Sequence, residues 1–326
     1  MIGTTVADAR TGRTSAGPAR RRRGWLAPAL FLAPALVIMA LVLGYPVLSA
    51  IWTSLNADFL TKPDADHFVG LGNFTALLLH DPTFWKTVLR TVIWAVANLI
   101  PQIVLGLVLA LILHRRLLAR GFVRSVVIIP WIVPTVVVAF LWLFLLDPTS
   151  GPLNHLLQAT GIVDSPPVWF SDASTAFPVL ILVSLWKWTP FVTVILLGAL
   201  QTVPPELEEA AVIDGAGRLQ RFRYVVVPHI STSIALASLL TIAYSVNNFN
   251  GIWLFTQGGP AGATDTLTTL AYRTAFKEYD FGMAAAISVV IFVGLLGISA
   301  LYFYVIEGRR HRKGRPSRQH RKGRVA

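Results

Sequence analysis

Cysteine is absent from all 326 residues of the chain. Disulfide bonds, thiolate nucleophiles and thiolate metal sites are therefore excluded. Charged residues are also scarce, at 13% of the chain, whereas ordinary soluble domains carry about 25%. Hydrophobic residues make up 54% and include several long apolar runs. This composition predicts a polytopic membrane protein rather than a soluble domain with a large core.

Carboxylates and histidines are missing from the interior of the expected membrane spans. All 16 carboxylates and all seven histidines lie outside the expected membrane spans or at their ends. Ion-coupled secondary transporters and polytopic membrane enzymes normally carry such groups at depth, so both classes are disfavoured. The charged residue placed well inside a span is Lys187. No metal site is expected.

A phosphate-binding loop is missing as well. No lysine follows a Gly-x-x-x-x-Gly pattern, so the backbone cradle for nucleotide phosphates is not encoded. We expect that the chain is not an enzyme and does not hydrolyse ATP by itself. If it moves a solute against a gradient, a partner must supply the energy.

Six apolar runs are long enough to cross about 30 Å of hydrocarbon as helices. The sequence therefore predicts an all-α membrane protein with six transmembrane helices, at residues 27–53, 87–113, 122–146, 177–201, 230–255 and 283–306. Prolines interrupt the first four of these spans. Because proline removes a backbone donor, each one favours a kink in its helix.

Basic residues are distributed unevenly along the chain. The net charge is +12, and much of it lies in a basic N-terminal tail (1–24) and a basic C-terminal tail (308–326), which flank a six-span domain at 25–307. Arginines also fill the second-to-third and fourth-to-fifth loops, while the alternate loops are poor in them. The positive-inside rule then places both termini in the cytoplasm, and nucleic-acid binding is disfavoured.

Residues 204–228 form a short charged segment on this cytoplasmic side. Pro204 and Pro205 begin it, and glutamates fill the next turn, where they stabilise a helix dipole. Gly215 is expected to turn the chain into a second short helix. Small residues on an exposed helix allow another protein to approach closely; an ordinary solvated loop is the alternative. One face of the first helix holds Leu207, Ala210, Ala211 and Asp214, and one side of the second holds Leu219, Phe222 and Val226.

The fifth span, "TIAYSVNNFNGIWLF", is unusually polar for a membrane helix. Its amides and hydroxyls would be costly to expose to lipid. They either bond neighbouring helices or line a pathway for an uncharged, hydroxyl-rich solute. The residues concerned are Thr241, Tyr244, Ser245, Asn247, Asn248 and Asn250.

Lys187 lies in the stretch "SLWKWTPF" of the fourth span. One interpretation is that it extends to the membrane interface beside Trp186 and Trp188. The other is that the lysine and these aromatic rings form part of a solute pathway wall, which would suit a sugar.

The spacing within the charged segment resembles the EAA loop of ATP-binding-cassette (ABC) importer permeases. Their pattern is Glu-Ala-Ala-x3-Gly-x9-Ile-x-Leu-Pro, and this chain has Glu209-Ala210-Ala211, Gly215, Val225 and Val227-Pro228 at those positions. The two valines are conservative departures. Three further stretches, "HFVGLGNFTALLLHDPTFWKTVLRT", "IIPWIVPTVVVAFLW" and "WLFTQGGPAGATDTLTTLAYRTAF", are similar to the maltose-type, carbohydrate branch, so the resemblance extends from Trp25 to Glu307.

This resemblance implies a type I ABC importer permease of a bacterial cytoplasmic membrane that carries a sugar, expected to be a neutral oligosaccharide. The implied partners are a second permease subunit in a heterodimer, two copies of an ABC ATPase that bind ATP and Mg²⁺, and an extracytoplasmic solute-binding protein. No cofactor is expected in this chain. A permease of the same architecture that carries glycerol-phosphate-type solutes is the alternative, and an ion-coupled secondary transporter is a weaker one.

The resemblance also implies roles for individual residues. In the family, the EAA helix inserts into a cleft on the ATPase, which assigns coupling to Glu209, Ala210, Ala211, Asp214, Gly215 and Pro228. The fifth span resembles the Asn-Asn-Phe segment that lines the solute site of maltose-type permeases. This assigns the substrate pathway to Thr241, Tyr244, Asn247 and Asn248, together with Trp188 of the fourth span.

Overall fold

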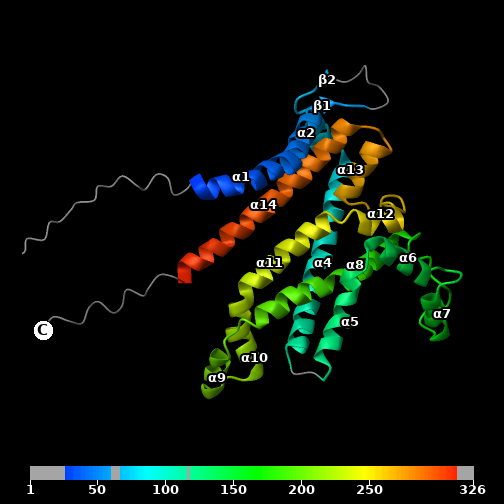
Figure 1. Ribbon diagram of the computed structural model, residues 1–326. Coiled ribbons are helices and arrows are strands. Elements are labelled where there is room, and N and C mark those ends of the chain that lie inside the picture. Colours follow the sequence, from blue (N-terminus) through cyan, green and yellow to red (C-terminus); the bar gives the residue numbers. More distant parts are fainter. Residues whose placement is uncertain (1–25, 60–66, 116–117, 314–326) are drawn as a thin grey trace, which may run out of the picture. The chain divides into compact units, whose positions relative to one another are not determined.

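The computed structural model of the protein describes residues 26–59, 67–115 and 118–313, with the backbone alone at 26–29 and 305–313. Nearly every element in these ranges is a helix (Figure 1). In chain order they are α1 (Leu26–Met39), η1 (Ala40–Gly44), α2 (Tyr45–Ser54), β1 (Asn56–Ala57), β2 (His67–Phe68), α3 (Gly72–Thr75), η3 (Ala76–His80), α4 (Pro82–His114), α5 (Arg120–Ile132), α6 (Thr135–Leu145), α7 (Pro152–Ala159), α8 (Ala173–Leu200), α9 (Pro205–Ile213), α10 (Arg218–Arg221), η4 (Phe222–Val226), α11 (Val227–Val246), α12 (Asn250–Thr256), α13 (Leu267–Phe276) and α14 (Phe281–Lys313).

Membrane-spanning candidates match the predicted layout. Among the described residues, five stretches are long and apolar enough to cross a membrane, namely Leu30–Ser54, Pro82–His114, Ala173–Leu200, Arg218–Thr256 and Phe281–Tyr304. A sixth candidate consists of α5 and α6, which are bent by 93° relative to each other. The predicted all-α fold with six spans is confirmed when this bent pair counts as one span. The backbone of α14 continues as helix past the predicted domain end at residue 307, and the rest of both predicted tails lies outside the described residues.

The predicted third span, 122–146, is not merely kinked at a proline but divided into two helices, α5 and α6. The backbone turns extended at Val133 (ψ 131°) and Pro134 (ψ 139°), between α5 and α6. Proline cannot donate the next helical hydrogen bond, and it disfavours the helical conformation of the residue before it. Apolar residues on both sides of the break hide it in the hydropathy pattern.

The predicted fifth span, 230–255, is also interrupted. Helix α11 ends at Val246, and α12 begins at Asn250. The side chain of Asn248 accepts a hydrogen bond from the backbone N–H of Gly251 at 3.1 Å. Asparagine side chains favour such local bonds over a continuous helix.

Contacts divide the chain into two compact units, residues 1–49 and 50–326. In the smaller unit, the large apolar side chains that the structure describes are mostly exposed, as suits a helix bordered by lipid. The larger unit contains the remaining helices and both predicted functional segments.

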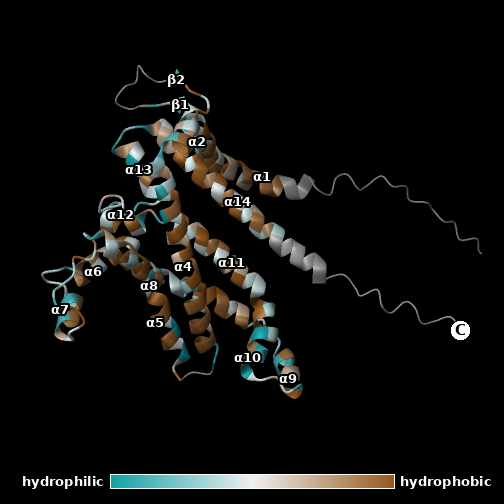
Figure 2. Cartoon of the chain, turned by 180° about the vertical axis from the view of Figure 1, so that it is seen from behind, coloured by the Kyte–Doolittle hydropathy of each residue, from teal (hydrophilic) through white to brown (hydrophobic). Residues whose placement is uncertain are grey.

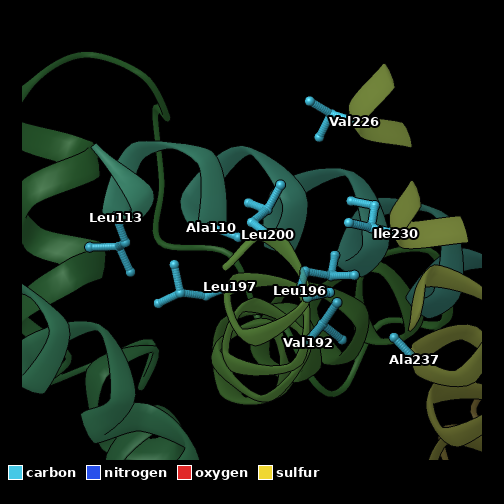
Figure 3. Packing of buried hydrophobic residues seen from close by; sticks show 10 residues of the cluster. Ala110, Leu113, Val192, Leu196, Leu197, Leu200, Val226, Ile230 and Ala237 are labelled. Atoms are coloured by element: carbon cyan, nitrogen blue, oxygen red, sulfur yellow. The ribbon is translucent and has the colours of Figure 1, made fainter. Parts of the chain in front are cut away.

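Helices α4, α8 and α11 form the centre of the larger unit, and α5 packs beside α8 (Figure 1). Their shared core is shown in Figure 3. Ala110 and Leu113 of α4 belong to one buried cluster with Leu196 of α8, and Val226 of η4 and Ile230 of α11 complete it. The core therefore joins two spans to the segment that follows the charged loop.

Polar elements gather at the ends of these long helices. Helices α9 and α10 lie at one end of the larger unit, and α13 and the β1–β2 pair lie at the other (Figure 1). Hydrophilic residues are concentrated on α7 and α10, whereas α4 and α8 are largely hydrophobic (Figure 2). We call the two ends of this unit the α9–α10 end and the α13 end.

The loop between α12 and α13 is ordered by a buried acid. Asp265 pairs with Arg273 of α13 and accepts a hydrogen bond from the Thr269 hydroxyl at 3.1 Å. The backbone N–H of Leu267 donates to the Thr91 hydroxyl of α4 at 2.9 Å. These bonds fix α13 against the second span at the α13 end.

Candidate functional site

The break between α11 and α12 places an asparagine beside two other helices. Trp94 of α4 is fully buried, and its indole N–H donates to the Ser245 carbonyl at 3.0 Å. This bond holds the last turn of α11 against α4. The backbone then turns through Asn247 and Asn248 before α12 begins, which leaves Asn248 half-buried.

Side chains from α4, α8 and α11 surround a small cavity next to this break. Its walls are Gln102, Ser184, Trp188, Phe191, Thr241, Tyr244, Ser245 and Asn248. Its volume is about 10 Å³, which is roughly the minimum that one water molecule needs. A solute can therefore enter only when these walls move apart.

Polar groups without partners face this cavity. The buried Thr241 hydroxyl has no hydrogen-bond partner among the described residues. Gln102 donates through Nε2 to Asn98 Oδ1 at 3.0 Å, which leaves its carbonyl oxygen as an acceptor. Because Asn248 uses its oxygen to bind Gly251, its amide NH₂ is left as a donor.

Aromatic rings complete the wall. Trp188 stacks on Tyr244 with ring centroids 5.1 Å apart, and the edge of Phe191 meets Tyr244 at 5.5 Å. None of the residues lining the cavity is charged. Neutral donors, neutral acceptors and flat apolar faces suit a hydroxyl-rich, uncharged molecule better than an ion.

The structure brings together four of the five residues predicted for the substrate pathway: Trp188, Thr241, Tyr244 and Asn248. It does not bring Asn247 to the cavity. The Asn247 side chain donates to the Ala243 carbonyl at 2.9 Å, and the residue is exposed. Sequence reasoning missed Gln102, Ser184 and Phe191, although neutral amides in an apolar span were a usable signal.

Lys187 does not reach an interface, contrary to one of its two predicted roles. The residue is only 5% exposed, and Nζ donates to the Val133 carbonyl at 2.7 Å. Proline at position 134 ends the helical pattern there, so this carbonyl needs another donor. The ammonium also lies 5.5 Å from the Trp188 ring centre. Lys187 thus stabilises the α5–α6 break and is not a wall residue of the cavity.

The predicted coupling residues lie on and after α9. Glu206 and Glu208 occupy its first turn, Asp214 follows its last residue, and Gly215 adopts a positive φ of 78°. The backbone N–H of Gly217 then donates to Gln220 Oε1 at 2.8 Å as α10 starts. The predicted residues are exposed or half-buried in this chain, namely Glu209, Ala210, Ala211, Asp214, Gly215 and Pro228.

Apolar side chains also stand uncovered around α9 and α10. Ile213 is 86% exposed, and Leu219 is 76% exposed. Leu219, Phe222 and Val226 line one hollow together, which agrees with their predicted place on one side of the second helix. Val226 joins the core and Phe222 packs against it, whereas Leu219 stays exposed.

A continuous run of chain connects the predicted coupling residues on α9 with the cavity beside Asn248. Helix α10 passes through η4 directly into α11, which ends one residue before Asn247. Pro228 lies in the first turn of α11, where its missing N–H is tolerated. The 20 residues of α11 therefore run from the charged segment to the cavity, where Thr241, Tyr244 and Ser245 form part of the walls.

Residues 102–313 match the family described as "binding-protein-dependent transport system inner membrane component". The chain is 37% identical over 283 residues to a probable ABC transporter permease protein of Sinorhizobium fredii, which covers 86% of this chain and 90% of that protein. It is 34% identical over 281 residues to a trehalose/maltose transport system permease protein of Thermococcus litoralis, with coverages of 86% and 94%.

A solved structure has the same fold. The chain matches one chain of a bacterial ABC transporter involved in the import of the acidic polysaccharide alginate, with a TM-score of 0.73 and 22% identity. The match covers 87% of this chain and 95% of that chain.

Proposed function

Because the chain belongs to the family of binding-protein-dependent transport system inner membrane components, we propose that it carries a neutral sugar, an oligosaccharide, through a bacterial cytoplasmic membrane. Membership of the family confirms the resemblance carried by the EAA loop. The chain is thus an ABC transporter permease. The observation that carries the choice of cargo is the uncharged cavity of amides, hydroxyls and stacked aromatic rings between α4, α8 and α11.

Two further points support a neutral sugar. The relative in Thermococcus litoralis is named for trehalose and maltose, which are uncharged disaccharides. Lys187, which precedes the wall residue Trp188, already donates to the Val133 carbonyl. An anionic solute of the glycerol-phosphate type would therefore find no free positive charge among the described cavity walls.

This chain supplies only part of the pathway in the proposal. Tyr244 forms one wall of the cavity, yet it is 47% exposed. A second, non-identical permease subunit would cover this side and complete a chamber large enough for a sugar. An extracytoplasmic solute-binding protein would deliver the sugar to the α13 end.

Energy comes from two copies of a partner ATPase in this scheme. The chain has no phosphate-binding loop, so ATP and Mg²⁺ bind the partner, and this chain is non-catalytic and needs no cofactor. Both chain termini and the α9–α10 end would face the cytoplasm, as the distribution of arginine favours.

The proposed contact with the ATPase is the exposed surface of Glu209, Ala210, Ala211, Asp214 and Gly215, with Pro228 starting the helix behind it. No described side chain covers Gly215, because the space around its α-carbon is open. Uncovered Ile213 would add apolar area to the same contact.

Reconstitution tests the function. The chain would be purified with its partner permease, ATPase and binding protein, and inserted into liposomes loaded with ATP. Uptake of maltose, trehalose and larger glucose oligomers would be compared with uptake of glycerol 3-phosphate. We expect uptake of a neutral sugar that requires ATP and persists with a protonophore. Uptake of glycerol 3-phosphate and of none of the sugars would contradict the proposal that the cargo is a neutral sugar. Loss of uptake with the protonophore would favour an ion-coupled transporter.

A glycine pair tests the coupling surface. Gly215→Trp places a large side chain where the ATPase is proposed to approach. Gly161→Trp is the matched control, because Gly161 also has a positive φ (70°) and open space around it, but it follows α7. We expect Gly215→Trp to abolish solute-stimulated ATP hydrolysis or ATPase co-purification, and Gly161→Trp to retain both. Equal behaviour of the two variants would remove Gly215 from the contact.

A further inference from the structure

A hollow of about 770 Å³ lies at the α9–α10 end, separate from the cavity described above. Its walls come from the last turn of α4, the end of α8 and the α10–η4 segment. The first two are ends of candidate membrane-spanning helices, so we expect the hollow at the boundary between hydrocarbon and water.

Positive charge dominates this hollow. Arg115, Arg218 and Arg221 line it, with His114 beside them and Glu208 as the opposing acid. None of the three arginines makes an ion pair with a described carboxylate, since both ion pairs among the described residues involve Arg273 of α13. The Nε of Arg221 is buried and has no partner among the described residues. Such groups need an anion or another acceptor.

Apolar side chains form the rest of the hollow. Leu111, Leu200 and Val226 lie on its walls, and the last two also belong to the core cluster shown in Figure 3. From Leu111 the same face of α4 continues through Val108 and Val104, both of which are exposed. An apolar strip therefore leads from the arginines along the span toward the middle of the membrane.

We propose that this hollow binds the headgroup of an anionic phospholipid, with the phosphate on the three arginines and one acyl chain along Leu111, Val108 and Val104. A soluble anion would use the arginines but leave the apolar strip without a role. An acidic loop of the ATPase would leave the same strip uncovered. Basic pockets at the ends of membrane helices on the cytoplasmic side are suited to anionic lipid headgroups. The inference does not depend on which solute the transporter carries.

Lipid binding to the purified transporter complex tests the proposal. Complexes in detergent would be titrated with phosphatidylglycerol or phosphatidylcholine, and the bound lipids would be counted by native mass spectrometry. The two key variants are Arg221→Gln, which changes the hollow, and Arg223→Gln, the matched control two residues later, which is exposed and does not line it.

We expect the wild-type complex to prefer phosphatidylglycerol. Arg221→Gln should weaken its binding about fivefold, and Arg218→Gln with Arg221→Gln together about 25-fold, since each arginine near an anionic lipid contributes on the order of 1 kcal/mol. Arg223→Gln should leave binding unchanged. Should Arg221→Gln fail to assemble, Arg115→Gln removes charge from the α4 side of the same hollow and is expected to match it.

Several results would overturn the proposal. Equal binding of the two lipids, or equal losses in Arg221→Gln and Arg223→Gln, would show that the hollow has no lipid preference. Displacement of phosphatidylglycerol by millimolar inorganic phosphate would indicate a site for soluble anions. Unchanged lipid binding in Arg221→Gln with loss of ATPase co-purification would make the hollow an ATPase contact instead.

Discussion

Asn248 has one half of its amide engaged and the other half available. Its oxygen caps the start of α12 through Gly251, while its NH₂ is left as a donor in a residue that lines the cavity. A donor held in place by its own oxygen is oriented before a ligand arrives, so binding does not have to order it.

Asn248→Ala should therefore weaken transport without preventing assembly. Loss of one hydrogen bond to a sugar hydroxyl costs on the order of 1 kcal/mol, which corresponds to about a fivefold fall in uptake at low solute concentration. Asn247→Ala is the control, because that side chain is exposed and bonds its own helix. Uptake per assembled complex would be measured in liposomes. If the two variants transport equally well, Asn248 is not part of the pathway.

Gly251→Ala tests the same site without changing a wall residue. A methyl group at position 251 would collide with the Asn248 amide, so this amide would have to move. We expect uptake to fall as in Asn248→Ala, and the double variant to be no worse than either single one, since both changes remove one interaction. Gly198→Ala, on α8 with open space around it, should transport normally. Fully additive losses in the double variant would contradict a shared mechanism.

The sequence predicts which residues of the fifth span are functionally polar better than it predicts which of their side chains point to the cavity. Thr241, Tyr244 and Asn248 stood out because amides and hydroxyls are costly in lipid. Asn247 looked equivalent, yet one residue along the backbone turns it away from the cavity. Gln102 lies among apolar neighbours in the second span, and only the packing of α4 on α8 and α11 brings it to the cavity.

Among the helices, the α5–α6 break receives a long-range hydrogen bond from α8. Lys187 of α8 reaches across to the Val133 carbonyl, at the residue where the backbone leaves the helix. A packed lysine without a described carboxylate partner is unusual in a span and is expected to have a specific role.

Lys187→Met should destabilise the chain, because it keeps the side-chain volume but leaves a buried carbonyl without a donor, at a cost of about 1–3 kcal/mol. Lys277→Met is the matched control, since Lys277 is exposed on the α13 end. Thermal unfolding of the purified complexes would be followed by the loss of a monodisperse chromatographic peak. We expect Lys187→Met to lower the midpoint of thermal unfolding and Lys277→Met to leave it unchanged. An unchanged midpoint would mean that the carbonyl finds another donor.

Helix positions were predictable where the chain is straight. Proline was expected to kink several spans. Helices α4 and α8 continue through Pro101 and Pro190, whereas in the third span the residue before Pro134 turns extended. Hydropathy reports that both halves of a broken span are apolar, and it carries no information on the angle between them.

For the molecule as a whole, orientation in the membrane is the property that the distribution of arginine predicts and that a labelling experiment can measure. The absence of cysteine provides a clean background. Ile213, at the α9–α10 end, is 86% exposed, and Ile162, after α7, is 69% exposed. A membrane-impermeant maleimide added to intact spheroplasts should label Ile162→Cys and not Ile213→Cys. The reverse pattern would invert the proposed topology.

The unbroken run from α10 through η4 and α11 has a thermodynamic consequence. About 30 Å of helix joins the surface proposed for the ATPase to the residues that flank Asn248. If the position of this rod affects binding at both of its ends, the two binding equilibria are linked reciprocally. The factor by which a trapped nucleotide state of the ATPase changes the affinity for the solute must then equal the factor by which bound solute changes the affinity of the permease for that ATPase state.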